Sequence, residues 1–261
     1  MSPGFFAAPL LSMRFVHVWR RNLLVWSKLA VPSVLGNLAD PMIFLFGLGY
    51  GLGAMMPAVQ GAPYIAFLAG GMVVSSTMYA ASFEAMYSAF SRMHMQKTWD
   101  AILNAPLTLE DVLLGALAWA ATKATLSGFT ILIVVSALGY ASWPTSAALL
   151  PVIVLTGLAF AAIGLSMNAL APNYDFFMYY FTLVITPTSL LSGVFFPIEQ
   201  LPAALRAAAA LMPLYHAVAL SRPLLLGEMP HAVLLHLAVP LVYAAAGYYL
   251  ALVLTRRRLL K

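Results

Sequence analysis

The sequence predicts an all-α polytopic membrane protein, and three observations lead to this fold class. Only 8% of the 261 residues are charged, whereas soluble domains carry about 25%. Apolar residues make up 63% of the chain, and the mean hydropathy is +0.92. Six apolar stretches are long enough to cross a bilayer, because a helix needs about 20 residues to span ~30 Å of hydrocarbon. We therefore expect one transmembrane domain over residues 1–261.

The first expected element is an amphipathic helix over residues 12–30, ahead of the apolar stretches. A 3.6-residue period places tryptophans on one face and cations on the other, which is typical of a helix lying in the headgroup plane. It is either a simple orientation anchor or a mechanical element, and the sequence leaves both open. The residues that define its two faces are Arg14, Trp19, Arg21, Trp26 and Lys28.

The apolar stretches predict six transmembrane helices, each nearly free of charge and bounded by proline, glycine or charged residues. They are residues 32–53, 63–88, 110–138, 147–170, 176–196 and 231–254.

The distribution of Lys and Arg predicts the orientation of these helices. With the N-terminus inside, ten cations lie in inner segments, whereas only Arg206 and Arg222 lie in outer ones. Both termini are therefore expected in the cytoplasm. The inner cations are Arg14, Arg20, Arg21, Lys28, Arg92, Lys97, Arg256, Arg257, Arg258 and Lys261.

The stretch "LSGVFFPIEQLP" interrupts the chain after the fifth expected helix. Gly193, Pro197 and Pro202 are expected to end that helix, and Glu199 places a carboxylate in the break. If residues 197–227 crossed the membrane, the final "RRRLLK" would lie outside, against the charge bias. We therefore expect an external re-entrant helical hairpin that packs against the other helices, because irregular backbone at membrane depth needs protein or water around it.

The loop over residues 91–109 is expected on the inner side and ends in a helix start signal. The Thr108 side chain can accept from the Asp111 amide while the Asp111 carboxylate reaches the Thr108 amide, as in a capping box. Glu110 and Asp111 also lie at the positive end of the helix dipole.

Three ionisable residues, Asp40, Glu84 and Lys123, lie within expected helices. Each costs about 2.5–3.5 kcal/mol at the bilayer centre, so they should face protein or water. We expect Lys123 to pair with Asp40 or Glu84, and a structural ion pair is favoured over a proton relay.

Several classes of function lack the residues they need. The chain has no cysteine, its histidines are scattered, and no metal site is expected. Gly-x-x-x-x-Gly-Lys-[Ser/Thr] is absent, so this chain is not expected to bind ATP itself. A membrane-embedded enzyme acting on lipid-linked sugars remains the alternative, although no catalytic cluster can be assembled. A structural subunit without its own pathway is a third interpretation, and nucleic-acid binding is disfavoured because the basic charge serves orientation.

Four features together resemble a known family. They are the amphipathic inner helix, "LADPMIFLFGLGYGLG", "WDAILNAPLTLEDVLLG" and "LLSGVFFPIEQLPAALRAAAALMPLYHAVALSRPLLLG". The chain is similar over essentially its whole length to the type-2 ABC exporter permeases, and most of all to the nodulation protein J group.

This resemblance implies a permease homodimer in the bacterial inner membrane, bound to two copies of an ABC ATPase that carries ATP and Mg. The interfacial helix and the inner loop would contact the ATPase, and the external hairpin would act as a lid on the pathway. The substrate would be lipid-linked or a glycan; the nodulation group is associated with lipo-chitooligosaccharide export, while polysaccharide, lipid and drugs stay open. The implied coupling residues are Asn104, Ala105, Pro106, Leu107, Thr108, Glu110 and Asp111.

Overall fold

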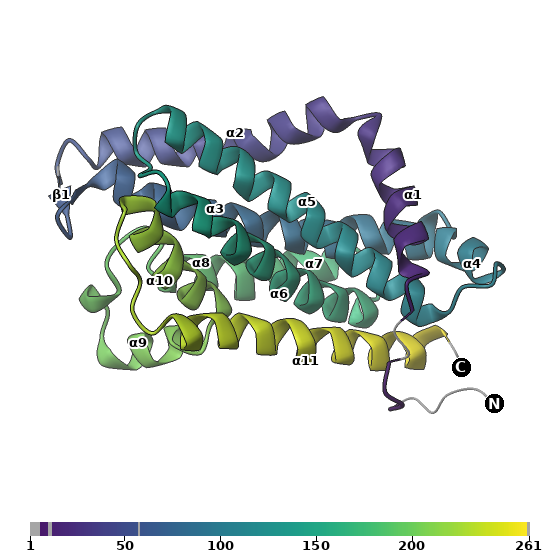
Figure 1. Cartoon of the computed structure of the whole chain (residues 1–261). Helices are drawn as coiled ribbons and strands as arrows, with labels where there is room; N and C mark the ends of the chain where they lie inside the picture. Colours follow the sequence, from purple (N-terminus) through teal and green to yellow (C-terminus); the bar gives the residue numbers. More distant parts are fainter. Residues whose placement is uncertain (1–5, 10–11, 57, 260–261) are drawn as a thin grey trace.

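The computed structural model describes residues 6–9, 12–56 and 58–259. The long helices run along one axis, with α1, α4 and the end of α11 at one end of the bundle and β1 and α9 at the other (Figure 1). These are called the α4 end and the α9 end below. Lys261, one of the expected inner cations, lies outside the described residues.

The elements follow one another as helices with one short hairpin of two strands. The first half comprises α1 (Phe15–Ser27), α2 (Ala30–Gly51), the antiparallel β1 (Ala58–Val59) and β2 (Ala62–Pro63), α3 (Tyr64–Phe83), the π-helical η1 (Glu84–Ser88) and η2 (Ser91–Met95), α4 (Thr98–Leu103) and α5 (Leu109–Ala137). The second half comprises the 3-10 helix η3 (Thr145–Ala148), α6 (Leu149–Leu170), α7 (Asp175–Tyr180), the π-helical η4 (Phe181–Ile185), α8 (Thr186–Leu191), the 3-10 helix η5 (Ile198–Gln200), α9 (Ala203–Ala209), α10 (Pro213–Leu226) and α11 (Val233–Leu259).

Five helical segments in the described part of the chain are long and apolar enough to cross a membrane. They are Ala30–Gly51, Tyr64–Met95, Leu109–Ala137, Thr145–Leu170 and Val233–Leu259. The pair α9 and α10, bent by 89°, would make a sixth if it counted as one broken span. The all-helical fold class is thus confirmed, while the path of the chain through the bilayer stays a prediction.

The expected fifth span, 176–196, differs from the other five. Its helix runs from Asp175 to Leu191 through a π-helical segment and is seventeen residues long. It is therefore roughly 25 Å long, since an α-helix rises about 1.5 Å per residue. It ends early because Gly193 takes φ +79, a left-handed conformation that a helix cannot continue through.

The expected loop over 91–109 is largely helical, so this prediction was wrong in part. The helix of α3 continues through η1 and η2 to Met95, and Lys97 then takes φ +51 before α4 begins. Met93 and Trp99 are buried, and this burial holds the segment against the bundle. α11 likewise continues past residue 254 to Leu259, because Arg256 is paired with a carboxylate of α5.

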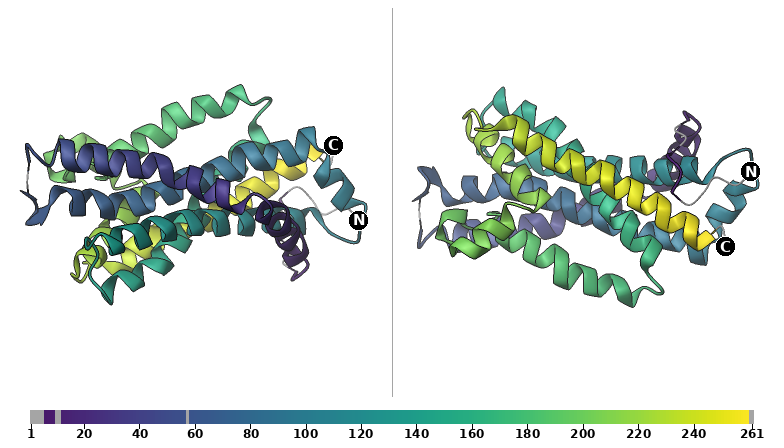
Figure 2. Two further views of the ribbon diagram at one scale, coloured as in Figure 1. Left: turned by 90° about the horizontal axis from the view of Figure 1, so that it is seen from above. Right: turned by 90° about the horizontal axis from the view of Figure 1, so that it is seen from below.

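The core lies around α3 and α6, whereas α2 lies on the outside of the bundle. α3 is buried along most of its length and α2 buries only Met42, Leu45 and Gly49. Figure 2 shows the α7–α8 run along one side of the bundle, set apart from α5 and α6. α3 is therefore flanked by α2 on one side and by α7–α8 on another.

Candidate functional site

A cavity of about 420 Å³ lies between α2, α3 and the η4–α8 segment. Asp40 and Phe44, which line it from α2, are exposed, whereas the serines of α3 are buried. The polar lining residues are Asn37, Asp40, Ser75, Ser76, Ser127 and Ser189, and the aromatic ones are Phe44, Tyr79, Phe83, Phe181 and Phe195. We call this cavity the groove.

Hydroxyl groups connect the helices that form the groove. The Ser75 and Ser189 Oγ atoms are 3.3 Å apart across α3 and α8, and the Ser76 and Ser127 Oγ atoms are 2.9 Å apart across α3 and α5. On α2, Pro41 lies inside the helix and cannot donate a backbone hydrogen bond to the carbonyl four residues earlier. The groove thus offers hydroxyl, amide and carboxylate groups beside aromatic rings.

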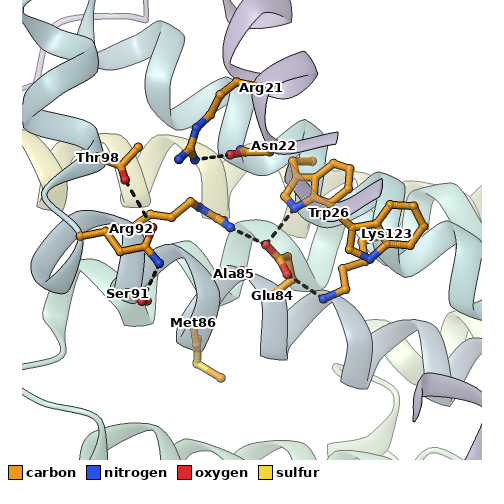
Figure 3. Close-up of polar contacts among 12 residues, drawn as sticks. Arg21, Asn22, Trp26, Glu84, Ala85, Met86, Ser91, Arg92, Thr98 and Lys123 are labelled. Atoms are coloured by element: carbon orange, nitrogen blue, oxygen red, sulfur yellow. Dashed lines mark hydrogen bonds and ion pairs between the residues drawn. The ribbon is translucent and has the colours of Figure 1, made fainter. Parts of the chain in front are cut away.

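Glu84 is the centre of a buried charge cluster at the start of η1 (Figure 3). Its carboxylate accepts from Arg92 Nη1 at 2.8 Å, from Lys123 Nζ at 2.9 Å and from the Trp119 indole Nε1 at 2.9 Å. The partners come from η2 and α5, so the cluster joins the second and third long helices. Asp40 lies in the groove instead, so the structure pairs Lys123 with Glu84 and not with Asp40.

The helix α1 packs against α5 beside this cluster. Val18 and Asn22 are its buried residues, and a Cβ added at Gly115 of α5 would lie 2.6 Å from the Val18 Cβ. Arg21 donates to the Asn22 side chain at 3.0 Å, and burial together with the nearby Arg92 guanidinium lowers the pKa of Arg21. α1 is therefore packed onto the bundle along one face.

Both predicted tryptophans of α1 make hydrogen bonds to the bundle helices. Trp19 Nε1 donates to Thr122 Oγ1 at 3.0 Å, and Trp26 Nε1 donates to Ser33 Oγ at 2.8 Å. Lys28, by contrast, is exposed. The indoles thus connect α1 to α5 and α2, in addition to any role they have at the headgroups.

The predicted capping box at the start of α5 is confirmed. Asp111 N donates to Thr108 Oγ1 at 3.3 Å, and Thr108 N donates to Asp111 Oδ2 at 3.0 Å. Ser12 also donates to Asp111, and Arg14 Nη1 donates to the Pro106 carbonyl at 2.9 Å. The segment before α1 is therefore bonded directly to the turn before α5.

The seven predicted coupling residues fall into two groups by exposure. Asn104, Ala105, Pro106 and Thr108 are exposed and Leu107 is half-buried. Glu110 and Asp111 are buried, and Glu110 accepts from Arg256 Nη2 of α11 at 2.6 Å. Only the exposed group is available to a partner protein, and the buried acids hold the end of the bundle together.

Comparison with known proteins identifies the family. Residues 11–226 match the family model described as ABC-2 type transporter. The chain belongs to the ABC-2 type transporter family. It is 50% identical to a Nodulation protein J of Rhizobium leguminosarum bv. viciae, over 99% of this chain and all of that relative. It is 49% identical to a Nodulation protein J of Rhizobium meliloti (strain 1021) over 97% of each chain. It is also 24% identical to Inner membrane transport permease YadH of Escherichia coli (strain K12) over 91% of each.

An ABC-2 type permease is the membrane subunit of a transporter and is not itself an ATPase. This chain is thus a multi-pass membrane protein, and nucleotide binding lies on a separate ATPase subunit. The alternative of a membrane-embedded enzyme for lipid-linked sugars is not retained. Among the residues described, no group of three or more His, Asp or Glu side chains could hold a metal ion.

The four predicted gate residues of the permease gather at the α9 end. Gly193 and Pro197 are buried on either side of the turn after α8, and Pro202 precedes α9. Glu199 is exposed and accepts from Gln60 Nε2 at 3.2 Å. α9 and α10 then form the bent pair, which ends where Gly227 takes φ +90.

Sequence reasoning singled out Asp40 but missed the serines that line the groove from several helices. Ser75 and Ser76 stand in the apolar helix α3, and this pair of adjacent hydroxyls was the available signal. Arg222 was counted only as an outer charge, although its guanidinium bonds to backbone carbonyls of α3 and of the turn after α8. No periodicity relates residues so distant in the chain.

Proposed function

We propose that two copies of this permease, with two copies of the ATPase, export a lipid-linked or glycan substrate from the cytoplasm along the groove. The observation that carries the proposal is the mixed lining of the groove. Its volume of about 420 Å³ falls within the range of about 300–1,000 Å³ that is usual for small-molecule sites. Its serines, Asn37 and Asp40 suit the hydroxyl groups of a sugar, and its aromatic rings suit sugar faces or an acyl chain.

The place of the groove supports a dimer. α2 exposes apolar side chains along its length, among them Ile43, Phe44 and Phe46, and Leu183 of η4 is exposed beside the groove. A second copy packed on this face would enclose the groove between two protomers. A substrate with a lipid tail could enter such a path from the side.

The distribution of charge supports the orientation. The α4 end carries the inner cations that lie within the described residues, and the α9 end carries Arg206 and Arg222, so we assign the α4 end to the cytoplasm. The family relatives include an inner membrane permease, which supports the inner membrane of a bacterium as the location. The bent pair α9–α10 would then lie in the outer leaflet without crossing.

The exposed turn before α5 is the proposed contact with the ATPase. α4 and residues 104–108 project at the α4 end, where a cytoplasmic partner could bind them (Figure 1). Movement of the turn would reach α1 through Arg14 and Ser12, and α5 through Asp111. The groove residues Ser127 and Asn37 lie on α5 and on the helix that follows α1, so both connections lead to the groove.

The substrate class is supported by the relatives. Those named Nodulation protein J suggest a role in nodulation, and the resemblance to that group favours lipo-chitooligosaccharide. The test uses a strain that lacks the permease gene but synthesises the lipo-oligosaccharide. Expression of this chain with its ATPase should move the radiolabelled lipo-oligosaccharide from the cells to the medium. Retention in cells that contain the assembled complex would refute the proposal for this substrate.

A variant of the groove makes the test specific. Ser76→Phe would place a phenyl ring at the lining of the groove, so export should fall strongly while the permease and its ATPase still copurify. Thr125→Phe, on the same helix as Ser127 but outside the groove lining, is the matched control. Equal export by the two variants would show that the substrate does not pass through the groove.

A further inference from the structure

The turn between α8 and η5 is held by side chains from two other elements. Arg222 of α10 donates to the carbonyls of Gly193 and, at 3.4 Å, of Val194. The Tyr64 hydroxyl, at the start of α3, donates to the Phe195 carbonyl at 3.0 Å. Three successive carbonyls that have left a helix are therefore satisfied from outside the turn.

Arg222 also contacts α3 directly. Its Nε donates to the Phe67 carbonyl at 3.1 Å, and its guanidinium carbon lies 3.6 Å from the centroid of the Phe67 ring. Each hydrogen bond of this guanidinium to a described residue ends on a backbone carbonyl. This contrasts with Arg92 and Lys123, whose partner is the buried carboxylate of Glu84.

Two adjacent glycines of α3 make this contact possible. A Cβ added at Gly70 would lie 2.8 Å from the Arg222 Cα, and one at Gly71 would lie 2.9 Å from the Val194 Cα. The Ser221 hydroxyl donates to the Gly70 carbonyl as well. α10 and the turn therefore approach the backbone of α3 from two sides at the same level.

We propose that Arg222 is the positioning residue that keeps the α9 end of the groove closed. It acts through the turn Gly193–Phe195, whose last residue lines the groove. This proposal rests on the proposed function, in which the groove is the substrate path and its α9 end faces outward.

Arg222 is suited to hold a contact that opens and closes because its hydrogen-bond partners are backbone carbonyls. If the turn moves away from α3, the Arg222 guanidinium loses its hydrogen bonds to the carbonyl oxygens of the turn. Because these partners are uncharged, the movement strands no buried carboxylate. Water at the outer surface can solvate both the guanidinium and the carbonyls. The contact can therefore open and close, whereas the Glu84 cluster cannot open without leaving the buried Glu84 carboxylate unpaired.

The absence of cysteine from the chain allows a direct test. Ser189→Cys places a single thiol in the groove, at a buried position below the turn. Its rate of reaction with a membrane-impermeant maleimide, added outside to cells containing the permease and its ATPase, reports access from the α9 end. Adding Arg222→Met should raise this rate about tenfold or more, which corresponds to about 1.4 kcal/mol. Arg222→Lys should raise it less, because an ammonium keeps the charge but lacks the planar fork of donors.

Two controls accompany this comparison. Arg206→Met removes the exposed cation of α9 and should leave the rate unchanged. Tyr64→Phe removes one hydrogen bond from the same turn and should raise the rate by about fivefold, in line with a neutral hydrogen bond of about 1 kcal/mol. If Arg222→Met fails to reach the membrane, Arg222→Lys and Tyr64→Phe carry the test.

Unchanged rates in the Arg222 variants and in Tyr64→Phe would overturn the proposal. Ala204→Cys, on the exposed face of α9, reports which side of the membrane the α9 end occupies. If it reacts only in inverted vesicles, the proposed orientation is wrong, and the Ser189→Cys comparison made in those vesicles still tests the role of Arg222. If the Arg222 variants lost export while their maleimide rates stayed unchanged, the proposal for Arg222 would fail and the proposed function would not.

Discussion

The Glu84 carboxylate accepts hydrogen bonds from three side chains, two of which are cations. The carboxylate that these two cations and one indole share is buried, whereas the two cations are half-buried. Removing Lys123 leaves Glu84 paired with Arg92, whereas removing the charge of Glu84 leaves two cations together without an acid. The carboxylate is therefore the partner on which the cluster depends, and this asymmetry favours a structural role over a proton relay.

We predict that Glu84→Gln destabilises the permease more than Lys123→Met does. Breaking a buried pair by removing one partner costs about 3–5 kcal/mol, because an unpaired charge remains. That cost applies in full to Glu84→Gln and only in part to Lys123→Met. The measurement is the thermal unfolding midpoint of the purified protein in detergent, with the exposed Lys97→Met as the control. Equal midpoints for the two cluster variants would contradict this account.

The turn between α4 and α5 combines an exposed surface with a buried anchor. Its exposed residues lie within residues 104–108. Its buried anchor is Asp111, whose carboxylate accepts hydrogen bonds from Thr108 and Ser12. A partner that pushes on the exposed part would move α1 and α5 together, because the anchor connects both. Contact with the ATPase and stability of the permease should therefore depend on different residues of one short segment.

Two substitutions in this segment should separate the two properties. Ala105→Arg adds a long side chain to the exposed part, so less ATPase should copurify while the unfolding midpoint stays unchanged. Asp111→Ala removes the capping box, which is worth about 1 kcal/mol, and should lower the midpoint. Copurification from detergent extracts and thermal unfolding check the two effects. A fall in the midpoint with Ala105→Arg, or none with Asp111→Ala, would refute the division.

The whole molecule is asymmetric along its long axis. The α4 end carries most of the cations, the segment bonded to Asp111 and the last turn of α11, whereas the α9 end carries the glycine- and proline-rich break. In the part of the chain that the structure describes, five helices are long enough to cross, and α7–η4–α8 is shorter than these. In the proposed orientation α1 and the end of α11 lie on the same side, so we propose that this shorter run also spans the membrane and returns the chain to the α9 end.

Labelling of single cysteines should place the two ends on opposite sides of the membrane. Ala204→Cys on α9 should react with an impermeant maleimide in intact cells. Asp100→Cys on α4, which is also exposed, should react only after permeabilisation. The reason is the excess of Lys and Arg at the α4 end, which is retained in the cytoplasm. Reaction of both from outside would rule out the proposed crossing of α7–η4–α8.

Sequence patterns predicted the long helices, the capping box and the break at Gly193 because each depends on neighbours in the chain. The end of α5 at Ala137 lies within one residue of its expected position. Patterns failed for residues 91–95, where polar side chains suggested a loop. Burial of Met93 and the pairing of Arg92 with Glu84 keep this segment helical. For the candidate site, the sequence indicated Glu84 and Lys123 but left their pairing open.

By itself the sequence determined that this chain is a helical membrane protein, where its long apolar helices lie and which family it resembles. These properties follow from hydrophobicity and local backbone preferences, which are written in consecutive residues. Only the tertiary structure decided that Lys123 pairs with Glu84, that serines from three helices meet in the groove and that Arg222 holds the turn after α8. These contacts depend on how helices are rotated and packed against one another, and that arrangement is set by side chains distant in the chain.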